Sequence, residues 1–168
     1  MEKRRLAPPH SKVKQLTELR TIATDAKREG RTVVFANGCF DVINVGHTRY
    51  LEGARSQGDL LIVGINSDQS VRALKGAGRP LQSAEERAEI VASFECVDYV
   101  LIFADPTVDR LLRELQPDIH AKGTDYTSES VPERATVRSY GGIVAIVGDP
   151  KEHSSRDVIA RILDRLHS

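Results

Sequence analysis

The sequence lacks both a net charge and a long apolar run. Its 24 lysines and arginines are balanced by 24 aspartates and glutamates, so no overall field is present to hold a nucleic acid. No stretch approaches the roughly 18 apolar residues of a membrane span. The first residues, MEKRRLAPPHSK, contain no apolar signal segment. We therefore expect a soluble cytoplasmic protein with no nucleic-acid or membrane partner.

Cysteine and the common cofactor motifs are also scarce. Cys39 and Cys96 lie far apart, without a CxxC motif or a nearby histidine pair, so neither a zinc site nor a disulfide framework is indicated. No cluster of carboxylates marks a metal site built from protein groups alone. The GxGxxG loop of a dinucleotide-dependent oxidoreductase is missing after the first apolar strand, which argues against that class.

The 168 residues are enough for one domain of ordinary size, and we predict a single domain. Proline and charge content predict disorder over residues 1–10. Residues 11–30 carry apolar side chains at helical spacing and predict an amphipathic lead-in helix, which would cover either a partner or the protein's own sheet. We therefore divide the chain into a tail and lead-in helix, residues 1–30, and a main domain, residues 31–168.

Strand-like and helix-like segments alternate through the main domain. Ser83 with Glu86 forms a capping box, and Asp105 with Pro106 predicts a helix start. The alternation predicts an α/β fold: a Rossmann-like, doubly wound, five-stranded parallel sheet with helices on both faces. Ligands of such sheets bind beyond the carboxyl ends of the strands. The strands are predicted at 32–37, 59–66, 97–103, 118–121 and 142–148.

The segment 35-FANGCFDVINVGHTRYL-51 joins the first predicted strand to the first helix of the sheet. Backbone amides and the helix dipole at such a junction bind anions. Gly38 and Gly46 permit a close approach, and His47 would donate a hydrogen bond to a phosphate held there. Taken alone, a single histidine is more often a surface or core residue.

This segment resembles the (T/N)GxFDxxHxGH loop of the HxGH nucleotidyltransferase superfamily, the cytidylyltransferase-like enzymes; here it reads NGCFDVINVGH. The resemblance extends over residues 32–163. It is strongest to the adenylyltransferases that act on D-glycero-beta-D-manno-heptose 1-phosphate, through NSD at 66–68, KGAGRP at 75–80, KGTDY at 122–126 and HSSRDVI at 153–159. It implies direct in-line transfer of AMP from ATP to the sugar phosphate, giving ADP-heptose and pyrophosphate, and it makes residues 31–168 the nucleotidyltransferase domain.

The resemblance also assigns roles to individual residues. The catalytic candidates are His47, Lys75 and Asn44. The substrate-binding candidates are Asp41, Asn66 and Arg79. The nucleotide-binding candidates are Asn37, Gly38, Cys39, Phe40, Gly46, His47, Lys122, Gly123, Asp125, Ser154, Ser155 and Arg156.

Residue chemistry alone leaves several of these roles open. Lys75 and Arg79 could equally well bind phosphates or lie in solvent on a surface loop. Ser154 and Ser155 at the start of a helix would bind phosphates, serve as a plain cap, or do both. Lys122 and its neighbours would otherwise form an ordinary loop. Cys39 has no base beside it in the sequence and is interpreted as a packing residue.

Asn44 departs from the superfamily pattern, because it stands where HxGH has its first histidine. An amide donates a hydrogen bond but carries no positive charge. Asn44 therefore leaves open a weakly active nucleotide-binding module. A separate alternative is a nucleotidyltransferase that uses another base or acceptor (GTP or CTP; glycerol 3-phosphate, phosphopantetheine or FMN). We expect Mg²⁺ to be held mainly by the triphosphate, with no metal ligand from the protein, and we expect a homodimer, as in many members of the superfamily.

Overall fold

The structure is a computed structural model and describes residues 7–150 and 152–167. Five parallel strands form one sheet in the order β3-β2-β1-β4-β5. The central strand β1 pairs with β2 on one side and β4 on the other, so the strand order reverses beside β1. The predicted five-stranded Rossmann-like sheet is confirmed. Its strands are β1 (Val33–Gly38), β2 (Leu60–Asn66), β3 (Tyr99–Phe103), β4 (Ile119–Lys122) and β5 (Ile143–Ile146).

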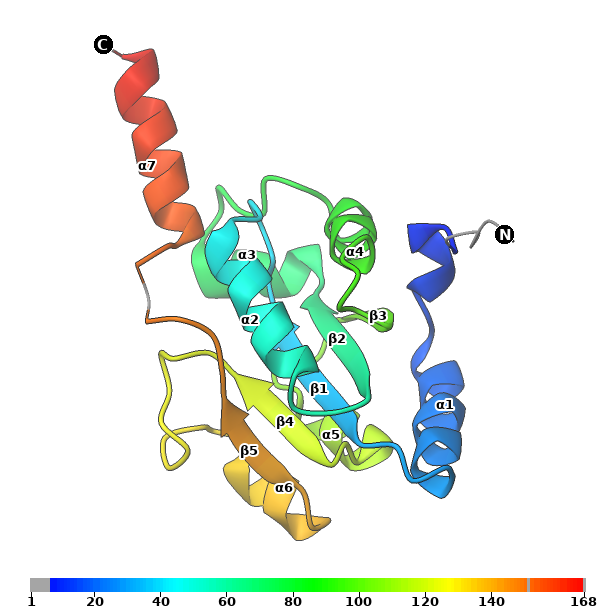
Figure 1. Ribbon diagram of the computed structural model, residues 1–168. Coiled ribbons are helices and arrows are strands. Elements are labelled where there is room, and N and C mark those ends of the chain that lie inside the picture. Colours follow the sequence, from blue (N-terminus) through cyan, green and yellow to red (C-terminus); the bar gives the residue numbers. More distant parts are fainter. Residues whose placement is uncertain (1–6, 151, 168) are drawn as a thin grey trace, which may run out of the picture.

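Helices cover both faces of this sheet (Figure 1). One core joins Val34 and Ala36 of β1 to α2 and α4, and the other joins Val33 and Phe35 to α1 and α5. Alternate β1 residues thus enter opposite cores, as the two-residue period of a strand requires. The helices are η1 (Pro9–Lys12, a 3-10 turn), α1 (Leu16–Arg28), α2 (Val45–Arg55), α3 (Asp68–Lys75), α4 (Ala84–Ala92), α5 (Asp109–Leu115), α6 (Arg134–Ser139) and α7 (Ser155–Leu166).

The lead-in helix α1 packs on the protein's own sheet. Leu19, Ala23 and Ala26 are buried in the core that contains Phe35. Just before α1, the backbone N–H of Lys14 donates to the Val100 carbonyl of β3. The prediction of disorder over residues 1–10 was wrong for Pro9 and His10, which belong to the turn η1, whereas residues 1–6 lie outside the described residues. The sequence left open whether the lead-in helix covers a partner or the protein's own sheet, and the structure shows that α1 covers the sheet.

The predicted start of α5 was also wrong. The helix begins at Asp109 with Val108 at its N-cap, rather than at Pro106. The Asp105 carboxylate accepts two hydrogen bonds from Arg110, at 2.8 and 3.0 Å. This charge-assisted pairing occupies the oxygens that would otherwise cap the helix. The predicted capping box of Ser83 and Glu86 on α4 is confirmed.

Helix α7 extends away from the body of the domain (Figure 1). None of its residues is buried, and its large apolar side chains Ile162, Leu163 and Leu166 are at least half exposed. Within residues 7–150 and 152–167, no helix is both long and apolar enough to cross a bilayer.

Candidate active site

A cleft of about 710 Å³ lies at the carboxyl ends of β1 and β4, where the strand order reverses. This is where sheets of this kind bind ligands. All the predicted nucleotide-binding and substrate-binding residues line the cleft, as do the predicted catalytic residues His47 and Lys75. The exception is Asn44. A second cleft of about 420 Å³, between residues 13–17 and β3, contains none of the predicted site residues.

Asn44 caps helix α2 instead of lining the cleft. Its Oδ1 accepts a hydrogen bond from the Gly46 amide at 2.9 Å, and its Nδ2 donates to the Val42 carbonyl at 3.3 Å. Asparagine is one of the favoured N-cap residues because its short side chain reaches the free amides of the first turn. Both ends of the Asn44 amide are therefore used within the chain, and the residue stabilises the first turn of α2.

His47 is a neutral hydrogen-bond donor in this arrangement. Its Nδ1 accepts from the backbone N–H of Asn44 at 3.2 Å, which places the ring hydrogen on Nε2. Burial, and secondarily the charge of Lys75, lowers the pKa of His47 to about 4. Phe40 packs against the imidazole with ring centroids 5.4 Å apart. A neutral imidazole with Nε2–H in a cleft donates to an anionic oxygen without needing to be protonated.

The carboxylate of Asp41 anchors the loop that follows α3. It is buried and accepts from Arg79 Nε at 2.6 Å and from the amides of Leu81 and Gln82. Burial opposes the charge on Asp41, but these hydrogen bonds outweigh it and hold its pKa below the usual value. Both predicted substrate-binding residues on this side, Asp41 and Arg79, thus pair with each other at the edge of the cleft.

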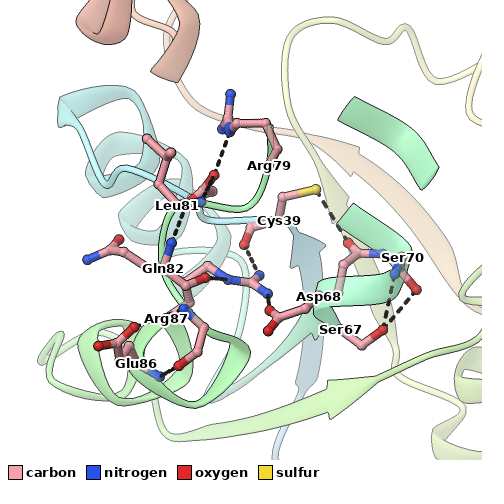
Figure 2. A network of polar contacts seen from close by, with 12 residues as sticks. Cys39, Ser67, Asp68, Ser70, Arg79, Leu81, Gln82, Glu86 and Arg87 are labelled. Carbon is pink, nitrogen blue, oxygen red and sulfur yellow. Dashed lines mark hydrogen bonds and ion pairs between the residues drawn. The ribbon is translucent and has the colours of Figure 1, made fainter. Parts of the chain in front are cut away.

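Arg87 is an important residue that sequence reasoning missed. It is fully buried in α4, and its guanidinium donates to the carbonyls of Cys39 and Gln82 and to the Asp68 carboxylate at 2.8 Å (Figure 2). It therefore connects the loop after β1 to the starts of α3 and α4. The signal was present in the sequence: Arg87 falls on the apolar stripe formed by Ala84, Ala88 and Val91, where a solvated arginine does not belong.

The N-terminus of α7 is fastened to the same loop. Ser154 and Asp157 form a reciprocal capping box. The Ser155 hydroxyl donates to the carbonyls of Asp41 at 2.5 Å and Val42 at 3.2 Å. The two serines therefore hold α7 in place, and the first turn of the helix, with its free amides, borders the cleft.

The loop after β4 forms another wall of the cleft. Lys122, the last residue of β4, lies 3.7 Å from the Glu133 carboxylate and 4.7 Å from the centre of the Tyr126 ring. Thr124 donates to the Asp149 carbonyl at 2.6 Å, which joins this loop to the segment after β5. The sequence analysis gave no individual role to several further lining residues, although Tyr50, Thr124, Tyr126, His153 and Asp157 lie within its quoted segments. The full set is Tyr50, Leu74, Thr124, Tyr126, Val147, Gly148, Asp149, Pro150, His153 and Asp157.

The cleft is lined by both cationic and acidic side chains: Lys75, Arg79, Lys122 and Arg156, and Asp41, Asp125, Asp149 and Asp157. The ammonium of Lys75 makes no ion pair with any residue in the described ranges. Burial raises the pKa of the Cys39 thiol despite the nearby cations, which agrees with a packing role. Within residues 7–150 and 152–167, no group of three His, Cys, Asp or Glu side chains is placed to hold a metal ion. Because Lys75 has no carboxylate partner among the described residues, its ammonium is available to a negatively charged ligand in the cleft.

Residues 35–161 match the cytidylyltransferase-like family. The bifunctional protein HldE of Syntrophotalea carbinolica is 48% identical over 155 residues, covering 92% of this chain and 32% of that protein. HldE of Geobacter sulfurreducens is 48% identical over 153 residues, covering 91% of this chain and 31% of that protein. The chain thus spans about a third of these relatives' length. The crystal structure of the lipopolysaccharide core biosynthesis protein from Thermoplasma volcanium GSS1 has a TM-score of 0.60 and 25% identity, over 70% of this chain and 94% of that one. The chain therefore belongs to the cytidylyltransferase-like family.

Proposed function

We propose that this chain is a nucleotidyltransferase that transfers AMP from ATP to D-glycero-D-manno-heptose 1-phosphate. One observation carries the transfer chemistry: neutral His47, Lys75 and the first turn of α7 meet in one cleft at the end of β1. The choice of sugar is supported by the segments at 66–68, 75–80, 122–126 and 153–159, which resemble heptose 1-phosphate adenylyltransferases and all contribute to that cleft. The Thermoplasma volcanium neighbour is a lipopolysaccharide core biosynthesis protein, which agrees with a heptose substrate.

In the proposed reaction, an oxygen of the sugar phosphate attacks the α-phosphorus of ATP in line. A new P–O bond forms, the bond between the α- and β-phosphates breaks, and pyrophosphate leaves. The attacking oxygen is already anionic, so no general base is required. The protein contributes position and charge stabilisation, which are the main sources of rate in such transfers.

The geometry suggests a role for each group. His47 Nε2–H donates to an oxygen of the α-phosphate as charge shifts onto it, and Lys75 offsets the charge of the phosphates. The amides at the start of α7 hold the leaving pyrophosphate. Mg²⁺, bound mainly by triphosphate oxygens and water, would neutralise part of the same charge. Asp41, Arg79 and Asn66 lie on the acceptor side.

Two further parts of the proposal concern the setting of the enzyme. We propose a cytoplasmic protein, because its substrates are phosphorylated metabolites of the cell interior. We also propose a homodimer. The exposed apolar side chains of Ile162, Leu163 and Leu166 on α7 are the natural place for a second copy to pack.

The test is pyrophosphate release with heptose 1-phosphate and Mg²⁺, using ATP, GTP, CTP and UTP in parallel. We expect release with ATP. Release with another nucleotide alone would correct the base. If none of the four nucleotides gives pyrophosphate release but calorimetry detects binding of a triphosphate, the result would point to another acceptor or to a binding module.

A further inference from the structure

A histidine lies buried beneath the floor of the cleft. His120 is on β4, is fully buried, and packs its ring against Phe35 of β1 with centroids 5.8 Å apart. His120 lies in the strand predicted at 118–121 and belongs to none of the predicted site residues. Most strand positions in such a core hold aliphatic residues, so a polar ring here calls for an explanation.

Its contact with a cleft residue is specific. His120 Nε2 lies 3.0 Å from Asn37 Oδ1, while His120 Nδ1 is buried without a hydrogen-bond partner among the described residues. An amide oxygen only accepts hydrogen bonds, so the ring hydrogen is on Nε2 and Nδ1 is bare. Burial, and then the charge of Lys122, lowers the pKa of His120 to about 3, so the ring is neutral near pH 7.

This contact determines which end of the Asn37 amide is available to a ligand. Asn37 belongs to β1 and lines the cleft. With Oδ1 held by His120, Asn37 Nδ2 remains as the end that donates. A half-turn of the amide would set the Nδ2–H donor against Nε2, which would then have to accept. The ring hydrogen would move to Nδ1, where it would be buried without a partner among the described residues.

We propose that His120 is a positioning residue for the transfer reaction: it holds Asn37 Oδ1 so that Asn37 Nδ2 donates to a phosphate or hydroxyl oxygen of a bound substrate. This inference rests on the proposed function. It accounts for a buried ring nitrogen left without a partner, because the ring is retained for its other nitrogen. His120 itself does not contact substrate.

The first test needs no variant. Long-range ¹H–¹⁵N NMR on the ligand-free chain at pH 7 reports which ring nitrogen of His120 carries hydrogen. We expect the Nε2–H form. The Nδ1–H form would overturn the proposal, because Nε2 would then have no hydrogen to give to Asn37 Oδ1.

The second test is a double-mutant cycle. His120→Val fills the strand position but removes the donor, and we expect kcat to fall roughly tenfold, as for a misplaced contact group. His120→Gln, whose amide can donate near the same place, should restore most of kcat. In an Asn37→Ala background, His120→Val should have no further effect, because its action passes through Asn37.

Three results would overturn the inference: an unchanged kcat in His120→Val, the same loss in His120→Gln, or an undiminished loss in the Asn37→Ala background. If His120→Val fails to fold, the cycle is run with His120→Leu. If both variants fail to fold, the tautomer measurement decides the proposal by itself. Absence of pyrophosphate release from the wild-type chain would refute the proposed function, whereas the tautomer would still decide whether His120 holds Asn37.

Discussion

At the scale of single residues, the cleft separates groups that act on a ligand from groups that hold them. His47 and Lys75 have a hydrogen or a charge directed to the cleft, whereas Asn44 and Asp41 use their polar atoms within the chain itself. Substitutions should therefore divide into those that change turnover and those that change stability.

His47→Ala and Lys75→Ala are expected to lower turnover at least roughly a hundredfold, because each removes stabilisation of charge in the transition state. Steady-state pyrophosphate release and thermal melting are the measurements. Arg72→Ala is the control for Lys75, since it is exposed on the same helix but outside the cleft. A large fall in melting temperature would mean that these residues are structural.

Asn44→His should change turnover by less than about threefold while lowering stability by about 1 kcal/mol, the usual loss for an N-cap. The reason is that Asn44 caps α2 and does not face the cleft. Steady-state kinetics and urea unfolding measure the two effects. A large gain in turnover would show instead that asparagine at this position impairs the enzyme.

At the scale of elements, the site depends on three connections that hold separate segments to the loop after β1. Asp41 holds the loop after α3, Arg87 holds the starts of α3 and α4, and Ser155 holds α7. Gly46 allows the last of these, because a Cβ there would come within 2.9 Å of the His153 carbonyl.

Asp41→Asn should destabilise the fold by about 2–4 kcal/mol, since it leaves a largely buried Arg79 without its carboxylate. It should also raise KM for the sugar phosphate by loosening the loop. Urea unfolding and kinetics report the two effects. Asp25→Asn, in the exposed pair with Arg28, is the control and should cost less than about 0.5 kcal/mol. Equal effects of the two substitutions would contradict the anchoring role.

At the scale of the whole molecule, two histidines, the partly buried His47 and the fully buried His120, couple stability to pH. The pKa of His47 lies at about 4 and that of His120 at about 3, both below the usual 6.5. Between pH 6.5 and 4 the unfolded chain binds protons that the folded chain excludes, so stability must fall as the pH is lowered through this window. Above pH 6.5 neither histidine contributes.

We expect the free energy of unfolding to decrease by on the order of 1–3 kcal/mol per histidine between pH 7 and 4.5. Urea unfolding across this range measures it, and His120→Gln should flatten the slope. The pKa of Asp41 is lowered from 3.8, so its contribution to stability is fully present above pH 3.8 and is lost only below that pH. Asp41 therefore does not contribute to the change between pH 7 and 4.5. If the free energy of unfolding stayed constant from pH 7 to 4.5, the histidine pKa values would not be lowered in the folded chain.

The proposed dimer is also a property of the whole molecule. Sedimentation equilibrium should give the mass of two chains, and Leu163→Gln should shift the chain to a monomer by removing apolar area from α7. Ile143→Gln, similarly exposed on β5, is the control. A single-chain mass at all concentrations would contradict the dimer.

The sequence by itself determined the sheet, its parallel strands and the edge at which the site lies. These follow from local information: apolar runs, helix periodicity and turn residues along a contiguous chain. It also identified most of the cleft residues through the motifs after β1, β2 and β4 and before α7.

Only the tertiary structure decided how the polar atoms of those residues are used. Asn44 turns to cap α2, Arg87 is buried among carbonyls, and His120 meets Asn37 across 83 positions of sequence. Asp105 pairs with Arg110 rather than capping α5. A side chain's partner depends on which segments the fold brings within about 3 Å, and no local pattern contains that distance.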